Sequence, residues 1–404
     1  MPEGSPGPGA SSSDPEAAVP ARVTVRRWGA PNGDRMVVDV AAGDGLVVHG
    51  IGVEPPEGAT KANGPTWAYL VDDGGLTLID PGHLGSLEFL ADGMAVLGLR
   101  PADVERVVVT HGHWDHDGGV AEFLDVSGAE FWAHELWQPY ASFSYSRLLR
   151  EDGSPLRAVM ARLGEGIRRE AERTGERVQG PGGGQQEYVE TRGRLRVDRA
   201  LADGDRHGAL EFLHTPGHWP DELTIRLGDV VLTGDHVLPE ITPHPSMRYE
   251  HPAEMAASLP ERHRDASDVW GLGAYLRSLR RVEDLGRGLP VLPAHRLFNR
   301  GRFLLVDNGR AGETIEHHRE RLERLWEIVA GGEETLEGAT RALFTERPLR
   351  DGYHLMSAVS ETISHVELLQ DTGDMEVGPD ARLRSTGSRD YRDFLGELGG
   401  DGRG

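Results

Sequence analysis

The sequence contains no cysteine among its 404 residues. This absence excludes disulfide bonds, thiolate metal ligands and a cysteine nucleophile. Long apolar runs are also missing, and none approaches the roughly 20 residues that a helix needs to cross a bilayer. Residues 1–20 lack both the basic start and the apolar core of a secretory signal. We therefore expect a cytoplasmic protein that has no membrane segment.

Positive charge is scarce in this chain. Lysine and arginine total 43 against 66 aspartates and glutamates, which gives a formal net charge of −23, and Lys61 is the only lysine. Proteins that bind nucleic acid without sequence preference need clustered basic side chains to neutralise phosphates. The charge balance therefore disfavours nucleic acid as a partner, although a locally basic cleft stays open.

The length and the pattern of apolar residues indicate several regions. Helical spacing appears over Arg157–Arg177, near Leu272–Leu279 and through most of the last third of the chain. From these changes we predict a disordered tail at 1–20, a main domain at 21–310 with helical insertions at about 140–200 and 239–281, a helical domain at 311–382, and a loose tail at 383–404.

Short apolar runs that predict buried strands end at polar residues. The runs are Trp67–Val71, Leu76–Ile79, Arg106–Thr110, Leu210–Leu213, Val230–Thr233 and Leu289–Leu292, and the polar residues after them include Asp80, His111, His214, Asp235 and His295. Strand ends that deliver histidine or aspartate to a loop are where α/β proteins place their chemistry.

The segment Val109–Gly119 places His111, His113, Asp115 and His116 directly after one of these strands. Imidazole together with carboxylate suits zinc, and also iron or manganese. In an extended stretch alternate side chains point the same way, so His111 and His113 can share one ion. Asp115 and His116 follow where the chain turns, and they can face a second ion.

Four side chains cannot complete the coordination of two metal ions. Three more candidates follow apolar runs and small-residue turns, namely His218 after Thr215-Pro-Gly, Asp235 after Thr233-Gly, and His295 after Pro293-Ala. The chain thus offers seven candidate ligands.

On these motifs residues 67–300 resemble the metallo-β-lactamase superfamily, whose signature is HxHxDH followed by a distant His, Asp and His. The resemblance implies an α/β (α+β) fold, a four-layer αββα sandwich, with two divalent metal ions, zinc first and iron or manganese as alternatives. One ion would be held by His111, His113 and His218, the other by Asp115, His116 and His295, and Asp235 would bridge them. Asp80 matches a family aspartate that supports a ligand without binding the metal.

The order TPGH, TGDH and PAH also resembles the glyoxalase II-like branch of that family. The segments Gly234–Pro239 and Ile241–Pro243 are similar to its beta-lactamase-like protein 2 subgroup. That subgroup carries a winged-helix appendage, which the helical C-terminal region resembles.

This resemblance implies a metal-dependent hydrolase. Two ions about 3.5–4 Å apart can hold a bridging hydroxide that attacks an electrophilic carbon or phosphorus, and Asp115 or Asp235 could move the proton. Our first expectation is a small-molecule thioester, ester or lactone substrate. Alternatives are phosphodiester hydrolysis of single-stranded RNA, which a basic surface from Arg147, Arg150 and Arg157 would favour, a mononuclear iron sulfur dioxygenase, and a non-enzymatic binding protein. A homodimer remains open.

Several other residues allow two interpretations. We interpret His83 as a loop residue, His134 as structural, and His236 as a bystander rather than a proton relay. Asp221 either orients a ligand or caps an element, and His317 and His318 are expected on a solvated helix face. An aromatic cluster is expected to be ordinary packing, with a substrate wall as the alternative; it comprises Trp132, Trp137, Tyr140, Phe143 and Tyr145.

Overall fold

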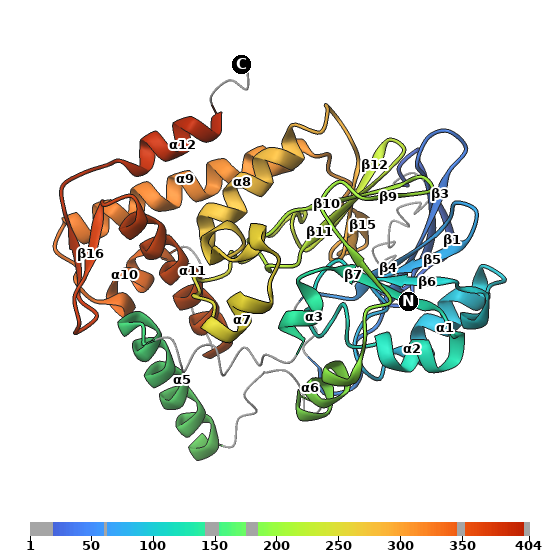
Figure 1. The fold of residues 1–404 in the computed structure, drawn as a ribbon, viewed down its shortest axis with the longest axis horizontal. Helices are drawn as coiled ribbons and strands as arrows, with labels where there is room; N and C mark the ends of the chain where they lie inside the picture. The colour runs from blue at the N-terminus through green and yellow to red at the C-terminus, as the bar shows by residue number, and fades with distance from the viewer. Residues whose placement is uncertain (1–18, 60–62, 142–152, 175–184, 346–351, 400–404) are drawn as a thin grey trace, which may run out of the picture.

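The computed structural model describes residues 19–59, 63–141, 153–174, 185–345 and 352–399. Two β-sheets pack face to face, and helices cover the outer face of each sheet, which gives four αββα layers (Figure 1). This arrangement confirms the predicted fold class. Phe143, Tyr145, Arg147, Arg150 and the connector at 179–184 lie outside the described residues.

The first sheet has eight strands in the order of the chain. They are β1 (Val23–Arg27), β2 (Val37–Ala41), β3 (Val47–Val53), β4 (Thr66–Asp72), β5 (Leu76–Ile79), β6 (Arg106–Val108), β7 (Glu130–His134) and β8 (Arg199–Leu201). Pairing is antiparallel up to β5 and parallel from β5 to β8. The carboxyl ends of β5, β6 and β7 therefore meet at one edge of the sheet.

The second sheet has five strands in the order β13-β12-β11-β10-β9. They are β9 (Arg206–His207), β10 (Leu210–His214), β11 (Leu223–Leu227), β12 (Val230–Gly234) and β13 (Val291–Pro293). Only the β12–β13 pair is parallel, so both strands end at the same edge. The insertion at 239–281 lies between these two neighbours.

The alternation of side chains along β4 explains how the layers join. Trp67, Tyr69 and Val71 face the second sheet and belong to the core between the sheets. Ala68 and Leu70 point the other way, into the core beneath the helices. Because both faces of this strand are buried, its sequence is a continuous apolar run. The backbone N–H of Trp67 also donates to the Ala294 carbonyl (2.8 Å), and the Tyr69 hydroxyl donates to the Pro293 carbonyl (2.7 Å), so β4 is tied to the end of β13.

Helices α1 (Leu87–Val96) and α2 (Val120–Ser127) cover the first sheet, burying Leu90, Met94 and Phe123 against it. The second sheet is covered by α8 (Gly271–Glu283), whose inner face packs on Val231 and Val291. The remaining short elements are η2 (Pro101–Asp103), α3 (Trp137–Tyr140), α6 (Gln185–Arg194), α7 (Ala253–Ser258), η3 (Glu261–His263), η4 (Ala266–Asp268), β14 (Phe298–Asn299) and β15 (Arg302–Phe303).

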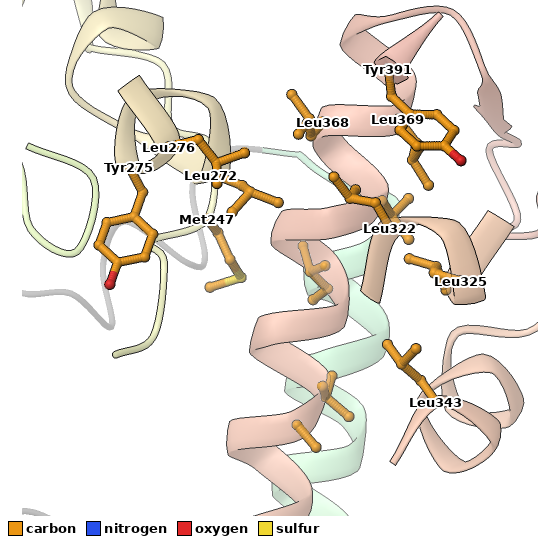
Figure 2. Packing of buried hydrophobic residues seen from close by; sticks show 14 of the residues in the cluster. Met247, Leu272, Tyr275, Leu276, Leu322, Leu325, Leu343, Leu368, Leu369 and Tyr391 are labelled. Atoms are coloured by element: carbon orange, nitrogen blue, oxygen red, sulfur yellow. The ribbon is translucent and has the colours of Figure 1, made fainter. Parts of the chain in front are cut away.

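The last third of the chain is helical, as predicted. It contains α9 (Gly309–Ala330), α10 (Leu336–Leu343) and α11 (Gly352–Asp371), then a hairpin of β16 (Met375–Val377) and β17 (Leu383–Ser385). These helices are not a separate unit, because Leu322, Leu325 and Leu369 share one core with Leu272, Tyr275 and Met247 (Figure 2). Helix α5 (Pro155–Thr174), from the first insertion, also packs along α11.

Two expectations about this region are wrong. The tail predicted to be loose contains α12 (Tyr391–Gly399), which the buried Tyr391 anchors through a hydrogen bond from its backbone N–H to Asp374. His318, predicted to be solvated, is fully buried, because α11 packs across that face of α9 and brings His365 against it. The neighbouring His317 is partly exposed.

The described members of the predicted aromatic cluster, Trp132, Trp137 and Tyr140, serve as packing. Trp132 lies in the core between the sheets, Trp137 packs edge-on against Phe131, and Tyr140 contacts Trp270. Within the described residues, none of the helices combines the length and apolar character that a bilayer crossing requires.

Candidate metal centre

The HGHWDH segment leaves the first sheet directly after β6. Asp80, at the end of the neighbouring β5, accepts hydrogen bonds from the backbone N–H (2.7 Å) and the hydroxyl (2.7 Å) of Thr110. The Thr110 carbonyl in turn accepts from the Leu223 N–H of β11 (2.8 Å). The loop therefore begins at the point where both sheets are joined. Asp80 itself has φ +55°, in the left-handed region that aspartate tolerates better than most residues.

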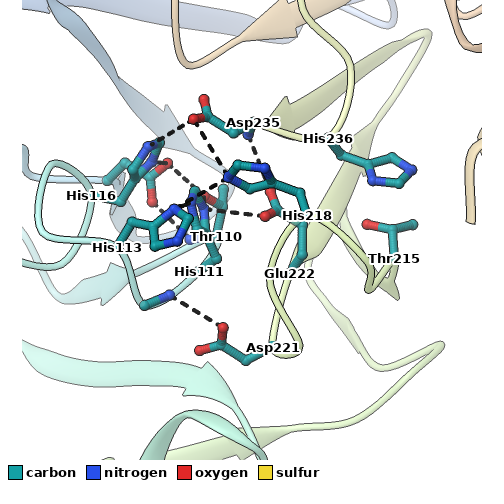
Figure 3. A network of polar contacts seen from close by, with 12 residues as sticks. Thr110, His111, His113, His116, Thr215, His218, Asp221, Glu222, Asp235 and His236 are labelled. Atoms are coloured by element: carbon teal, nitrogen blue, oxygen red, sulfur yellow. Dashed lines mark hydrogen bonds and ion pairs between the residues drawn. The ribbon is translucent and has the colours of Figure 1, made fainter. Parts of the chain in front are cut away.

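All seven predicted side chains converge at this edge. Figure 3 shows His111, His113, His116, His218 and Asp235 among them. The seven side chains come from the β6 loop and from the ends of β10, β12 and β13, and they form three overlapping groups that could hold a cation: His111 with His113 and His218, Asp115 with His116 and His295, and His111 with His116 and Asp235.

Asp235 lies between the first two groups. Its Oδ2 is 3.7 Å from His116 Nε2 and 3.8 Å from His218 Nε2, and its Oδ1 is 3.5 Å from His295 Nε2. A single carboxylate thus faces histidines of both groups. Asp115 faces the second group only, with its Oδ2 3.2 Å from His295 Nε2.

Four of the five imidazoles are fixed through Nδ1. His116 Nδ1 donates to Asp80 Oδ2 (2.9 Å), His218 Nδ1 to the His244 carbonyl (2.7 Å), and His295 Nδ1 to the Pro65 carbonyl (3.0 Å). His111 Nδ1 lies 3.1 Å from Thr110 Oγ1 and 3.4 Å from Glu222 Oε2. A proton held on Nδ1 leaves the Nε2 lone pair free to bind a metal ion.

The ring nitrogens that are not fixed point at one another, and their surroundings show whether the site suits metal ions. His113 Nδ1 lies 2.8 Å from His111 Nε2 and 3.2 Å from His218 Nε2. His116 Nε2, His295 Nε2 and Asp235 Oδ1 are buried and have no hydrogen-bond partner among the described residues. Unpaired buried lone pairs are costly unless something binds them. A mixed set of imidazole and carboxylate donors satisfies the requirements of zinc, iron or manganese.

Burial and charge set the protonation of this cluster. Burial lowers the pKa of His111, His113 and His218, which keeps them in the neutral form that binds cations. Burial acts in the same direction on His116, but Asp115, Asp235 and Asp80 outweigh it and raise the pKa of that ring. Burial would raise the pKa of Asp115, yet His116 and His295 hold it well below its ordinary value. Burial would also raise the pKa of Asp235, but His295 and His116 lower it in the same way. Asp115 and Asp235 are therefore both ionised.

Sequence reasoning missed Glu222, which is fully buried beside the candidate ligands. Its Oε1 accepts from the Asp235 backbone N–H (3.1 Å), and its Oε2 faces His111 Nδ1. Burial raises the pKa of Glu222 well above its usual range, and the charge of Asp235 adds to the effect. The sequence signal was a glutamate directly before the strand pattern Leu223–Leu227, at a position where we expect a buried side chain and not a solvated charge.

Asp221, His83 and His236 each have a contact that gives them a structural role. Asp221 holds the backbone, because its Oδ1 accepts from the Gly112 N–H (3.2 Å). His83 is buried beside Trp114, and burial lowers its pKa to about 4 even though Asp115 opposes this shift. His236 packs against Tyr275, away from the converging donors (Figure 3).

The described residues contain two further groups with histidines, and neither is arranged to hold a cation. His134, His214 and His263 are buried together, yet the rings of His134 and His214 stack 3.9 Å apart at 17°, so their lone pairs run parallel instead of meeting. In the group of His318, Glu361 and His365, the glutamate is already paired with Arg321. The structural interpretation of His134 fits this stacking.

A sequence model of the metallo-beta-lactamase superfamily matches residues 62–295, more than half of the chain. A metallo-beta-lactamase family protein of Thermus thermophilus is 25% identical, with a TM-score of 0.55 and coverage of 84% of this chain and 98% of that one. A beta-lactamase domain protein of Burkholderia ambifaria has the same fold at 22% identity, with a TM-score of 0.59 and coverage of 89% and 95%.

A curated protein, the probable metallo-hydrolase YqjP of Bacillus subtilis (strain 168), is 36% identical over 83 residues. The match spans 20% of this chain and a quarter of the length of that relative. Together with the αββα layers and the order of the seven donors, the match over residues 62–295 establishes that this chain belongs to the metallo-beta-lactamase superfamily.

Proposed function

We propose that this protein is a metal-dependent hydrolase that holds two divalent cations, zinc first and iron or manganese as alternatives. One cation is assigned to His111, His113 and His218, the other to Asp115, His116 and His295, with Asp235 between them. The convergence of these donors, with each Nδ1 proton of His116, His218 and His295 directed away from the centre, is the observation that carries the proposal. The name of the Bacillus relative supports the same reaction class.

Bound at this place, a pair of cations supplies Lewis acidity and an activated water near neutral pH. The chain's own groups provide orientation and proton movement. Asp115 and Asp235 are ionised carboxylates whose side chains are 13% and 10% exposed, so both are placed to accept a proton at the mouth of the centre. Asp80 and Glu222 orient the imidazoles and do not reach the reacting atoms.

We propose a small-molecule acyl substrate, a thioester, ester or lactone, because the surroundings of the centre are aromatic. Trp219 is partly exposed, and its ring lies 4.4 Å from that of His113, tilted by 50°. Trp114, within the HGHWDH segment, is also partly exposed. Two arginines near the centre already form ion pairs: Arg192 is buried and pairs with Asp117, and Arg296 lies 3.9 Å from Glu240. An acyl group can lie against such rings without a cationic anchor.

Phosphodiester hydrolysis is the second candidate. The hairpin β16–β17 after three helices is the element order expected of a winged-helix appendage, and it supports a place in the glyoxalase II-like branch near the beta-lactamase-like protein 2 subgroup. Against RNA, Arg157 is buried on Glu367 (3.1 Å) and does not extend a basic surface. A mononuclear iron dioxygenase is disfavoured because the donors for a second cation are complete. We retain a cytoplasmic location as part of the proposal and leave a homodimer open.

Metal analysis of the purified protein, followed by a hydrolysis screen, tests the proposal. We expect two metal equivalents and activity on at least one acyl thioester, ester or lactone, with none on single-stranded RNA. His113→Ala should lose metal and activity, whereas His317→Ala, on the partly exposed side of α9, should keep both. A fully active, metal-loaded His113→Ala protein would refute the mechanism.

A further inference from the structure

Helix α6, in the first insertion, carries a buried arginine that contacts the residue following the HGHWDH segment (residues 111–116). The Arg192 side chain is 6% exposed, and its Nε–H donates to Asp117 Oδ2 (2.8 Å). Tyr188, one turn earlier on the same helix, donates its hydroxyl proton to Asp117 Oδ1 (2.7 Å), and Trp137 donates its indole N–H to Oδ2 (2.9 Å). Asp117 directly follows His116, so three donors from outside the loop hold the residue next to a candidate ligand.

The same guanidinium lies against the backbone between two other candidate ligands. A Cβ atom on Gly112 would lie 2.1 Å from Arg192 Nη2, so a larger residue between His111 and His113 would have to displace this guanidinium. The Gly112 N–H donates to Asp221, three residues after His218, and Arg192 interacts electrostatically with both Asp221 and Asp117. One buried cation therefore faces the segment of His111–His116 and the segment of His218 together.

Burying a guanidinium is costly unless its charge is matched. Here Asp117 pairs with it at 2.8 Å, Asp221 adds a favourable electrostatic interaction, and the Trp137 ring lies 5.0 Å from its centre. Trp137 belongs to the core beneath the helices, and its ring contacts both Arg192 and Asp117. The pairing of Arg192 with Asp117 therefore connects the HGHWDH segment to that core.

We propose that Arg192 is a positioning residue for the metal centre, which makes α6 part of the site although it contributes no ligand. This inference rests on the proposed function, because it assumes that His111, His113 and His116 bind metal. The contact is indirect, and partners that orient metal ligands typically change metal affinity by about 10- to 100-fold.

The test is the rate at which zinc-loaded protein releases zinc to a colorimetric chelator. Arg192→Met should release zinc at least about 10-fold faster than the natural protein. Arg194→Met, at an 81% exposed position on the same helix, is the matched control and should release zinc at the natural rate. Thermal unfolding of the metal-free proteins separates a loss of fold from a loss of metal.

A second variant covers the case in which Arg192→Met does not fold. Arg192→Lys keeps the charge but loses the forked donors, so it should fold and still release zinc faster than the natural protein. Natural release rates in both folded variants, or in Arg192→Lys alone if Arg192→Met is unfolded, would overturn the inference. Failure of the proposed function looks different, because His113→Ala would then bind as much zinc as the natural protein.

Discussion

At the scale of the residue, His116 shows how one hydrogen bond prepares a ligand. Its Nδ1–H is held by Asp80, which is itself fixed by two contacts from Thr110. The apolar run before Asp80 predicted a strand end, and the resemblance to the family implied the supporting role of this residue. Glu222 was not predictable in the same way, since its contact with His111 depends on how two distant strands meet.

Asp80→Asn should lower metal affinity by about 10- to 100-fold, because the amide replaces the carboxylate that accepts the His116 proton. The fold should persist, since asparagine also tolerates a positive φ. Competition with a chelator measures the affinity. Asp44→Asn is the matched control, an exposed aspartate at φ +50°. Equal affinity in the two variants would contradict the role of Asp80.

His214 gives a prediction for acid stability. Burial lowers the pKa of its ring to about 4, against about 6.5 in an unfolded chain. Because the folded ring resists protonation, stability is full above pH 6.5 and is lost as pH falls toward 4. Between pH 6.5 and 5 the loss from this residue should be about 2 kcal/mol. Urea unfolding of His214→Gln should show a flatter pH profile than the natural protein, and an unchanged slope would exclude this source.

At the scale of the element, prediction succeeded where periodicity and burial agree. The run Leu76–Ile79 is β5 to the residue, and Leu336–Leu343 is α10. It failed for α12, whose sequence is charged and rich in glycine and is held by a few specific contacts. Tyr391, its one fully buried residue, begins a short repeat with Phe394, Leu395 and Leu398, which pack partly buried on the C-terminal core. The repeat spans only about two helical turns and is interrupted by Gly396, so the sequence pattern predicted a loose tail.

Tyr391→Ala should destabilise the protein by about 3–5 kcal/mol, because it removes a large buried ring together with the hydroxyl that donates to Glu323. Denaturant unfolding measures the change. Tyr391→Phe keeps the ring and should cost less. Asp393→Ala, at an exposed position of the same helix, should be near neutral. A Tyr391→Ala protein as stable as the control would show that α12 is not anchored to the core through Tyr391.

At the scale of the whole molecule, the candidate ligands belong to both sheets. His111–His116 follow the first sheet, whereas His218, Asp235 and His295 follow the second. Bound cations would therefore join the two halves of the sandwich, which neither the sequence pattern nor a single strand reveals.

Removing metal with a chelator should lower the unfolding temperature of the natural protein. A ligand present at 1,000 times its Kd stabilises the folded state by about 4 kcal/mol. The same chelator should leave the unfolding temperature of His113→Ala nearly unchanged. Calorimetry with and without chelator compares them, and an identical shift in both proteins would argue against cations that link the sheets.

The bonds from β4 to the end of β13 connect residues more than two hundred positions apart, as in the pair of Tyr69 and Pro293. Such long-range pairing is slow to form, because a large loop of chain must close before any contact compensates for the lost entropy. During synthesis the first sheet emerges from the ribosome long before Pro293 does. The HGHWDH loop is therefore complete while His218, Asp235 and His295 are still untranslated, so a centre that holds the proposed cations would be completed only late in the maturation of this protein.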